Sequence, residues 1–503
     1  MTNDAPRAAG YSQLIKKYEL AATPHWHESA VGPTSAHRIE RTASTVRETY
    51  PARHWPGDAL GDHLEFALKY DGVNLLILAK LFRAVSQDAI TEYVRSKPNG
   101  KYARRLWYLY ELLTGDRLPV EDIAAGNYVD LLEPELYYTA PPAQVPRQRV
   151  RDNLLGDARF CPTVRRTDGM TKFEQSDLAE RCRKLIEQYP VELLKRALAY
   201  LYTKESKSSF EIEHIKPSAN RTERFVALLQ LAEKEDFFLK PALIDLQNRI
   251  VDERFRDKDF RSNQNYVGES IAWQSERVHF VSPKPGDLQG LMDGMFGSHG
   301  RMGADAVHPV VHPVVHAAAI AYGFVFMHPF EDGNGRIHRF LIHNVLARRG
   351  FTPQGIMFPV SAVMLKRMAD YDASLEAFSK PLMPLVEYEL DEQGRMTVHN
   401  ETADLYRYAD LTAQAEALFD FIRETIEEEL VEELRFLVNY DATKRAIQDV
   451  VDMPDRRIDL FIRCCLQNHG RLSKRKREEF FDMLKDEEVA RMEEAVQNAY
   501  NPG

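Results

Sequence analysis

The chain has 503 residues, of which 44% are hydrophobic and 28% charged, and its formal net charge is -10. These values are typical of a soluble globular protein of about three domains. The negative charge disfavours nucleic acid or an anionic membrane as the main partner. No apolar run approaches the roughly 18 residues of a membrane span, and the N-terminal sequence lacks the apolar stretch of a signal peptide. Because the four cysteines form no C-x-x-C pair, we expect a cytoplasmic protein with reduced thiols.

Residues 1–165 are predicted to form a helical N-terminal domain. Apolar residues recur at helical spacing over 75–82 and again over 106–113, with turn signals between the two runs. A proline-rich connector, 140–146, ends the part that carries a clear pattern. The region contains no chemical motif, so we expect it to act as a scaffold or a partner-docking surface.

A short helix is predicted at about 207–215. Ser208 or Ser209 is a suitable N-cap, and Pro217 follows closely enough to stop the helix. On local grounds the segment is a capped turn.

Two short strands are predicted farther along the chain. Residues 260–270 and 277–283 flank a polar loop and favour a small β-hairpin. The plain interpretation is a hairpin at the surface.

Histidines at positions 308, 312 and 316 recur every four residues, which is a spacing that metal sites on helices use. Pro309 and Pro313 interrupt any continuous helix there, so the three rings are not expected to share a face. We therefore disfavour a metal cluster at this run. The next stretch, from Val314 to Met327, is apolar and nearly free of charge, and it predicts a buried helix.

The run HPFEDGNGRIHR, at 328–339, has the features of a phosphate site. Its two glycines end one helical pattern and open another. The backbone N–H groups of Gly333, Asn334 and Gly335 should therefore lie at the positive end of a helix dipole, where anions bind.

The charged residues of this run extend the same interpretation. Arg336 and Arg339 are three residues apart, so they share a helix face and can hold one polyphosphate. A carboxylate such as Asp332 beside phosphates usually binds Mg²⁺. His328 is placed to take a proton from an incoming hydroxyl. Together they predict a nucleotide phosphate site with a base beside it.

The same run resembles the signature of the Fic (filamentation induced by cAMP) family, H-P-F-x-[D/E]-G-N-G-R-x-x-R, at every specified position. The resemblance implies a mainly α protein. Its Fic-type helical catalytic core, with a small β-hairpin flap, would occupy 166–398 between helical N- and C-terminal regions. The implied activity is a protein adenylyltransferase that moves AMP from ATP to a Ser, Thr or Tyr hydroxyl of a target protein, or of the enzyme itself.

The resemblance also implies a role for each site residue. They are His328 as general base, Asp332 as the Mg²⁺ ligand, Gly333, Asn334 and Gly335 as the anion hole, and Arg336 and Arg339 as the holders of the outer phosphates. Tyr371 is similar to an aromatic residue that lines the base pocket in the family, although it equally suits a core position.

The segment at 207–215 resembles the inhibitory helix of Fic proteins, in the subclass that carries it N-terminal to the catalytic core. Ser209 and Glu213 match its defined positions, and the resemblance implies that Glu213 pairs with Arg339 and displaces the γ-phosphate of ATP. One position departs from the family, because His214 stands where Gly or Asn is usual. If that position needs a positive φ, His tolerates it less well than either.

The predicted hairpin falls where the family places its flap, at about 266–283. This resemblance implies that the flap docks the target protein by adding a strand. A second small hairpin, at 386–398, is predicted to end the catalytic region.

The C-terminal region, 399–503, is predicted to be a helical domain. It is compatible with a helix-turn-helix that has a basic edge near Arg475 and Lys476, although the acids beside them favour a solvated face. Two alternatives to AMP transfer stay open. The same site could remove AMP or transfer another phosphate-containing group, or the chain could be a nucleotide-sensing DNA-binding regulator.

Overall fold

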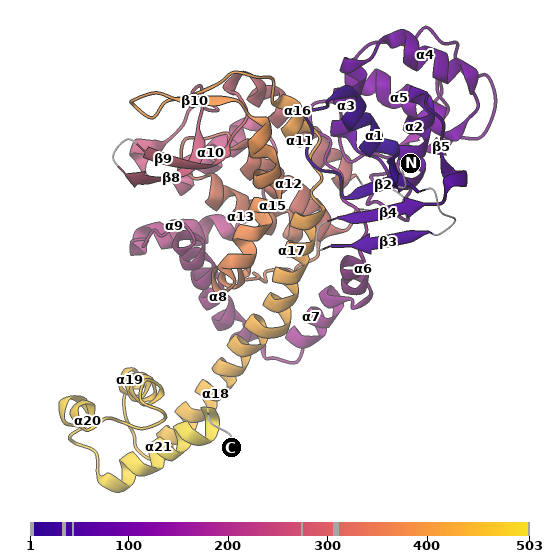
Figure 1. Cartoon of the computed structure of the whole chain (residues 1–503). Coiled ribbons are helices and arrows are strands. Elements are labelled where there is room, and N and C mark those ends of the chain that lie inside the picture. Colours follow the sequence, from indigo (N-terminus) through magenta and orange to yellow (C-terminus); the bar gives the residue numbers. More distant parts are fainter. Residues whose placement is uncertain (1–4, 33–36, 43–44, 273–274, 305–310, 501–503) are drawn as a thin grey trace.

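The computed structural model describes residues 5–32, 37–42, 45–272, 275–304 and 311–500 (Figure 1). The fold is mainly α, as the sequence predicts. Within the described residues, the strands form one four-stranded, one three-stranded and two two-stranded sheets. No described helix combines the length and the apolar character that crossing a membrane requires.

The N-terminal region combines helices with two small sheets. Its larger sheet has the order β1-β2-β4-β3, in which β2 and β4 run parallel and the outer pairs are antiparallel. The strands are β1 (Arg7–Ala8), β2 (His27–Val31), β3 (Arg38–Arg41), β4 (Val46–Tyr50), β5 (Val129–Asp130), β6 (Ala143–Val145) and β7 (Val150–Asp152). The helices are α1 (Gly10–Tyr18), η1 (Ala52–His54), α2 (Leu60–Phe66), η2 (Ala67–Asp71), α3 (Leu75–Ala84), α4 (Gln87–Ser96) and α5 (Lys101–Thr114).

The prediction of a purely helical N-terminal region is therefore incomplete. The two runs with helical spacing do form α3 and α5. These strands were not predicted because they are five residues long or shorter, and because the buried face of β2 is largely polar. His27 and Ser29 point inward there, and both bond to the fully buried carboxylate of Asp71. An inward-facing pair of polar residues hides the alternation that predicts a half-buried strand.

The central region is a helical body built around α12 (Pro313–Met327). This helix is apolar on all sides and almost every residue in it is buried, which confirms the predicted buried helix. Helices α11, α13 and α17 pack against it. The helices of this region are α6 (Asp168–Gln175), α7 (Leu178–Ile186), α8 (Val191–Glu211), α9 (Ala219–Leu229), α10 (Lys240–Ile250), η3 (Glu253–Phe255), α11 (Pro285–Gly303), α13 (Asn334–Arg348), α14 (Val360–Lys366), α15 (Met368–Leu382) and η4 (Met383–Leu385).

Both predicted hairpins are present. Strands β8 (Tyr266–Ala272) and β9 (Ser275–Val281) pair in antiparallel fashion, and so do β10 (Tyr388–Leu390) and β11 (Met396–Val398). Figure 1 shows β10 above the β8–β9 hairpin, at the same end of the body. The β8–β9 hairpin directly follows the loop after α10, which brings it close to the motif.

The histidine run does not form a cluster in the residues that the structure describes. His308 lies outside them. His312 caps α12 and accepts a hydrogen bond from the N–H of Val314, whereas Nε2 of His316 lies 3.0 Å from Nδ1 of His299. The described part of the chain holds no group of three His, Cys, Asp or Glu side chains placed to bind a metal ion.

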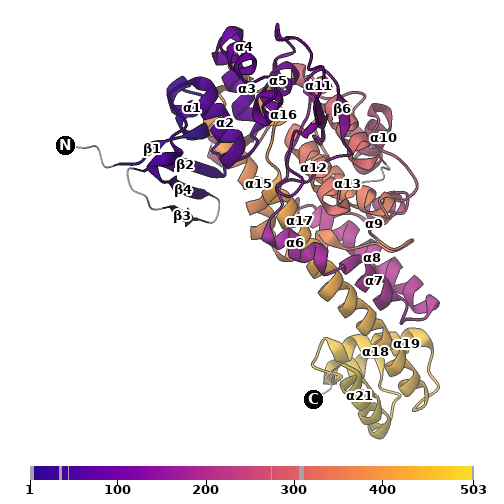
Figure 2. The same ribbon diagram turned by 90° about the vertical axis from the view of Figure 1, so that its right-hand side faces the viewer.

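The C-terminal region is helical, and from α18 (Leu430–Gln448) onward it extends away from the body (Figures 1 and 2). The apolar residues at helical spacing from Leu411 to Ile426 are buried against α12 and its neighbours. The helices are α16 (Ala403–Arg407), α17 (Thr412–Glu424), η5 (Thr425–Glu429), α18 (Leu430–Gln448), α19 (Asp455–Leu466), α20 (Lys474–Phe480) and α21 (Asp486–Tyr500). A separate small core, contributed by the end of α18 and by α19–α21, holds this last bundle together.

Candidate active site

His328 lies where α12 ends and the motif loop begins. It adopts a left-handed conformation, with φ 49° and ψ 57°, and its N–H closes the helix on the carbonyl of Phe324. Nδ1 lies 3.2 Å from the carbonyl oxygen of Val325. The tautomer assigned from this contact carries its proton on Nδ1 and leaves Nε2 as the acceptor.

The environment of His328 favours the neutral imidazole. Burial lowers its pKa to about 4, more than the Val325 carbonyl and the Asp332 carboxylate raise it, and the Arg261 guanidinium lowers it further. A neutral ring with an unprotonated Nε2 is the form that can accept a proton from a hydroxyl.

The side chain of Asn334 holds the loop closed. Its Nδ2 donates to the carbonyl of Phe330 at 2.7 Å, and its Oδ1 accepts from the N–H of Phe330 at 3.1 Å. The ring of Phe330 is fully buried. The motif loop is thus closed between Phe330 and Asn334. This structural role of the asparagine side chain was not predicted.

Helix α13 begins directly after Gly333, whose φ of 93° requires glycine. The first intrahelical bond runs from the N–H of Ile337 to the carbonyl of Gly333. Within the described residues, the N–H groups of Asn334, Gly335 and Arg336 have no acceptor, as expected of a first helical turn. A Cβ atom on Gly335 would lie 2.5 Å from Glu213 Oε1, so a side chain at this position would push the Glu213 carboxylate away.

Both arginines of the motif are buried and both pair with Glu213. Arg336 Nε lies 2.9 Å from Glu213 Oε2, and Arg339 Nη2 donates to Glu213 Oε1 at 2.7 Å. Arg339 also donates from Nε to Ser209 Oγ at 2.8 Å and from Nη2 to the Ser209 carbonyl at 2.5 Å. Burial alone would lower the pKa of Arg339, but the Glu213 carboxylate keeps it raised. The predicted partnership of Glu213 with Arg339 is therefore present, and Arg336 shares it.

The segment that bears Ser209 and Glu213 differs from its predicted form. It is not a short helix with Ser208 or Ser209 as N-cap, because α8 runs without a break from Val191 to Glu211 and both serines lie near its C-terminal end. No Gly or Pro interrupts that stretch, so the helix continues through the serines. Glu213 lies in the turn that follows, and His214 closes this turn with φ 56°.

Asp332 stands at the edge of the site with 40% of its side chain exposed. Its Oδ1 accepts from Arg336 Nη2 at 2.6 Å, and its backbone carbonyl accepts from Gln247 Nε2 at 3.3 Å. A single accessible carboxylate beside the predicted phosphate site would fit Mg²⁺, which binds through one or two protein oxygens and completes its shell with phosphates and water.

Tyr371 is buried in the core beside Arg339. Burial raises the pKa of its phenol, and the Arg339 guanidinium opposes that rise. Its ring centroid lies 6.2 Å from that of His338. Of the two interpretations offered by the sequence, this placement favours the core position.

Two residues upstream of the motif support the loop and were not predicted. Gln247, fully buried on α10, bonds to the backbone of Asp332, and Oδ2 of Asp257 accepts from the N–H of Glu331 at 3.2 Å. They reach the loop from 74 or more residues away in the chain. No local pattern marks such a contact.

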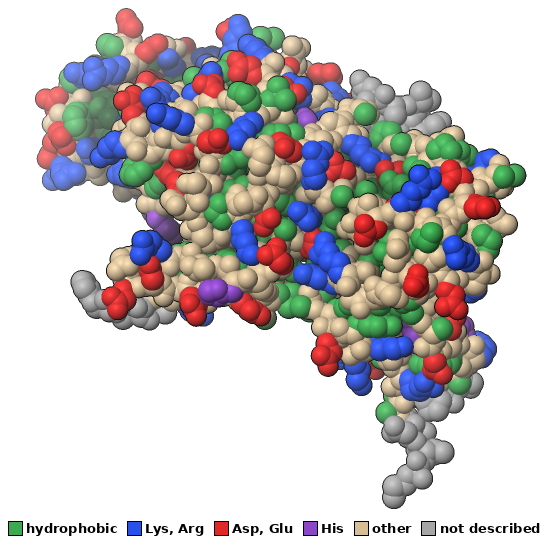
Figure 3. Space-filling view, turned by 90° about the horizontal axis from the view of Figure 1, so that it is seen from above, with side chains coloured by type: hydrophobic (Ala, Val, Ile, Leu, Met, Phe, Trp, Pro, Cys, Tyr) green, Lys and Arg blue, Asp and Glu red, His purple; other side chains and the backbone are tan. Residues whose placement is uncertain are grey.

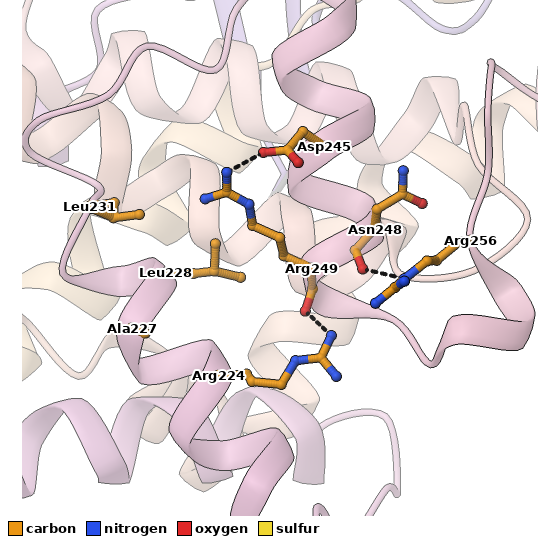
Figure 4. A pocket seen from close by; sticks show the side chains of 8 residues that line it. All are labelled: Arg224, Ala227, Leu228, Leu231, Asp245, Asn248, Arg249 and Arg256. Atoms are coloured by element: carbon orange, nitrogen blue, oxygen red, sulfur yellow. Dashed lines mark hydrogen bonds and ion pairs between the residues drawn. The ribbon is translucent and has the colours of Figure 1, made fainter.

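A separate cavity of about 390 Å³ lies between α9 and α10, and it contains none of the predicted site residues (Figure 4). Arg224 Nη2 donates to the carbonyl of Arg249, and Arg256 Nε donates to the carbonyl of Asn248, both at 3.0 Å. These guanidinium groups cap the last turn of α10. Arg249 itself pairs with Asp245 at 2.5 Å. The polar residues that line this cavity therefore stabilise α10, the helix whose Gln247 contacts the motif loop.

Residues 237–346 match the model of the Fic/DOC family. This range includes the flap hairpin and the whole motif, and it excludes Ser209 and Glu213. Over 181 residues the chain is 32% identical to the "Protein adenylyltransferase Fic" of Culex quinquefasciatus, which covers 36% of this chain and 31% of the relative. The protein of the same name from Drosophila melanogaster is 34% identical over 125 residues, which cover 24% of this chain and 22% of the relative. The chain thus spans less than a third of the length of these curated relatives.

Solved structures of related proteins share only a low overall similarity with this chain. A Fic family protein from Desulfovibrio desulfuricans G20 is 19% identical with a TM-score of 0.39, over 57% of this chain and 81% of that one. Fic-1 from C. elegans is 14% identical with a TM-score of 0.29, over 73% of this chain and 92% of that one. At these TM-scores, the solved structures do not support an inference about the fold or the function of this chain. The sequence match is what stands: residues 237–346 of this chain are similar to the Fic/DOC family.

Proposed function

We propose that the chain is a protein adenylyltransferase, which transfers AMP from ATP to a Ser, Thr or Tyr hydroxyl of a target protein. The observation that carries this proposal is the placement of a neutral His328 beside the open first turn of α13 and two buried arginines. The names of the curated relatives support the same activity. ATP as co-substrate suits the cytoplasmic location predicted from the sequence.

In the proposed reaction, the target hydroxyl oxygen attacks the α-phosphorus of ATP. A bond forms between these two atoms, the bond from the α-phosphorus to the oxygen that bridges to the β-phosphorus breaks, and pyrophosphate leaves. His328 Nε2 takes the hydroxyl proton while the Val325 carbonyl holds Nδ1–H. General base catalysis of this kind contributes about 10²- to 10⁴-fold in rate.

The phosphates would bind at the N-terminus of α13. The amides of its first turn and the preceding Gly333 favour negative charge there, and Arg336 and Arg339 would hold the outer phosphates. Loss of one such donor should cost about 10²- to 10³-fold in kcat. Asp332 would hold Mg²⁺, which would neutralise part of the phosphate charge when bound.

We further propose that Glu213 inhibits the enzyme. Its two carboxylate oxygens occupy the two arginines that the outer phosphates would need. ATP can pair fully with these arginines only if Glu213 moves away. Ser209 stabilises the inhibited arrangement through its two contacts with Arg339.

The β8–β9 flap is the proposed docking element for the target, with its strand edge available to a peptide backbone. The same arrangement would allow the chain to modify itself. Because Glu213 is retained, removal of AMP by a water molecule at the same site is the second candidate reaction.

Incubation of the purified protein with ATP labelled on the α-phosphate, in the presence of Mg²⁺, tests the proposal. We expect weak self-labelling by the wild type and much stronger labelling by Glu213→Gly. Glu211→Gly is the matched control, since Glu211 is exposed two residues earlier and contacts neither arginine. Equal labelling by wild type and Glu213→Gly would overturn the inhibition, and undiminished labelling by His328→Ala in the Glu213→Gly background would overturn the base assignment.

Incubation of the Glu213→Gly protein with cell lysate would then identify the target proteins. Release of AMP from a labelled target by the wild type, but not by Glu213→Gly, would instead favour AMP removal.

A further inference from the structure

Arg261 is a buried arginine just before the flap, and it contacts the backbone of the motif. Its side chain is almost fully buried. Its Nε donates to the carbonyl of His328 at 2.8 Å, and its own N–H donates to the carbonyl of Pro329 at 2.8 Å. One residue therefore fixes two successive peptide groups at the proposed general base.

The rest of the same guanidinium holds both ends of the flap. Nη1 donates to the carbonyl of Asn263, just before β8, at 2.7 Å, and Nη2 donates to the carbonyl of Pro283, just after β9, at 2.6 Å. Arg261 thus joins its own segment, which leads into the flap, to two segments that are distant in sequence: the chain just after β9 and the motif loop.

A second, weaker connection runs parallel to the first. Asn265 Nδ2 lies 3.4 Å from the carbonyl of Phe330, and the Asn265 carbonyl accepts from Ser282 Oγ at 2.7 Å. The carbonyls of His328, Pro329 and Phe330 therefore all accept hydrogen bonds from the base of the flap.

Arg261 makes no ion pair with a carboxylate among the described residues, and its partners are neutral carbonyls. Burial lowers its pKa to about 10, which still leaves the guanidinium charged near neutral pH. A buried charge held only by backbone is costly. This cost is consistent with a function in placing the groups that it contacts.

The conformation of His328 gives the contact its importance. A non-glycine residue with φ 49° persists only when its surroundings fix it. The Arg261 contact to the His328 carbonyl is part of that fixation. The same guanidinium sets where the two flap strands begin and end.

We propose that Arg261 is a positioning residue, which locks the flap and His328 into one rigid unit so that a hydroxyl docked on the flap meets Nε2. This inference rests on the proposed adenylyl transfer and adds a determinant to it. Arg261 contacts none of the groups assigned to ATP, so its effect should fall on transfer and not on nucleotide binding.

Lysine cannot replace it. An ammonium group is a compact charge, whereas the planar guanidinium reaches three carbonyls in fixed directions. Arg261→Lys therefore keeps the positive charge but cannot make the three hydrogen bonds of the guanidinium, and Arg261→Met removes both the charge and the hydrogen bonds. Arg254→Lys is the matched control, because Arg254 lies in the same segment with a side chain that is 79% exposed.

The test compares these variants in the Glu213→Gly background. We expect Arg261→Lys to lower the single-turnover rate of AMP transfer by about 10²-fold, as for other misplacements of catalytic groups. The Kd for ATP should stay within about twofold of the parent value, because Arg261 contacts no group of the proposed phosphate site. Arg254→Lys should change neither quantity. An unchanged transfer rate in Arg261→Lys, or an equal loss of ATP affinity, would overturn the proposal.

Amide hydrogen exchange provides a readout that does not depend on activity. In both Arg261 variants, exchange should rise together in residues 276–283 and 328–332, and it should remain unchanged in α12. Exchange that rises in only one of the two segments would show that Arg261 does not join them. If the Glu213→Gly parent transfers no AMP, the proposed function fails, and the exchange measurement still decides whether Arg261 holds the flap to the motif.

Discussion

His328 illustrates how backbone geometry selects the chemistry of a side chain. The left-handed conformation turns the chain out of α12 and lets Nδ1 face the Val325 carbonyl in the helix that has just ended. Nε2 is then the only ring nitrogen that can act as a base. The depressed pKa keeps that nitrogen unprotonated at neutral pH.

A pH profile of AMP transfer follows from this environment. Protonated His328 cannot accept a proton, so activity is lost as the pH falls through the pKa of the imidazole. Since burial places that pKa at about 4, we expect single-turnover transfer by Glu213→Gly to be nearly flat between about pH 6 and 8. Tryptophan fluorescence at each pH controls for unfolding. A half-maximal rate near pH 6.5 would show that His328 titrates like an exposed histidine.

At the scale of elements, α8 positions Ser209 and Glu213, the two residues proposed to inhibit the enzyme. Its Glu205 is fully buried and bonds to His343 Nε2 on α13 at 2.7 Å and to the N–H of Ser361 on α14 at 2.8 Å. The end of α8 is thus fixed against the helix that bears both motif arginines. Ser209 follows one turn later, and Glu213 lies in the turn that ends the helix.

The turn at His214 should limit how tightly Glu213 is held. At φ 56°, a residue with a side chain loses about 1 kcal/mol relative to glycine. We therefore expect His214→Gly to strengthen inhibition and to lower self-labelling with labelled ATP by about fivefold, the factor that corresponds to about 1 kcal/mol.

His214→Ala is the control, because alanine bears the same backbone cost without the imidazole. It should not tighten inhibition. Higher labelling by His214→Gly, or an equal decrease in both variants, would show that the conformation of this turn does not set the strength of inhibition.

The elements also show what could be predicted from the sequence. The motif was predictable because its functional groups lie within twelve consecutive residues, and local turn and helix rules place them. Arg261 and Gln247 were not, because they reach the motif loop only through the packing of distant segments. The predicted N-cap at Ser209 was wrong for a related reason. A serine is compatible with either end of a helix, and the partner of its hydroxyl, here Arg339, is distant in the sequence.

At the scale of the whole molecule, the C-terminal bundle is a distinct unit. Its core contains Ile447 and residues of α19–α21, and it shares no residue with the large core around α12. Figures 1 and 2 show α18 extending from the body to this bundle. Contacts between the two parts run mainly along α18, for example through the Arg196–Asp441 ion pair at 2.7 Å.

The charges of the molecule bear on the alternative of DNA binding. On the face seen in Figure 3, basic and acidic side chains are interspersed. In α20, Lys476 pairs with Glu479 at 3.7 Å and Arg477 pairs with Asp486. Such pairing favours a solvated face, as the sequence suggested. A gel shift that survives His328→Ala and depends on Arg475 and Lys476 would support the alternative.

The separation of the two cores predicts that the bundle can be weakened without loss of catalysis. Phe461 is fully buried in the bundle core, with its ring 5.3 Å from that of Phe481. Phe461→Ala should destabilise the bundle by about 3–5 kcal/mol. Amide exchange should then rise across residues 455–500 while α12 and α13 keep their protection.

In the Glu213→Gly background, we expect AMP transfer by Phe461→Ala to stay within about twofold of the parent, because changes at distant sites with no shared partners are usually independent. Met483→Ala is the control, since that side chain is 55% exposed on the same bundle. A loss of transfer that accompanies the increased exchange would mean that the bundle acts on the catalytic core. The path for such coupling would be α18 and its ion pair with α8, the helix that holds Glu213 against the two arginines.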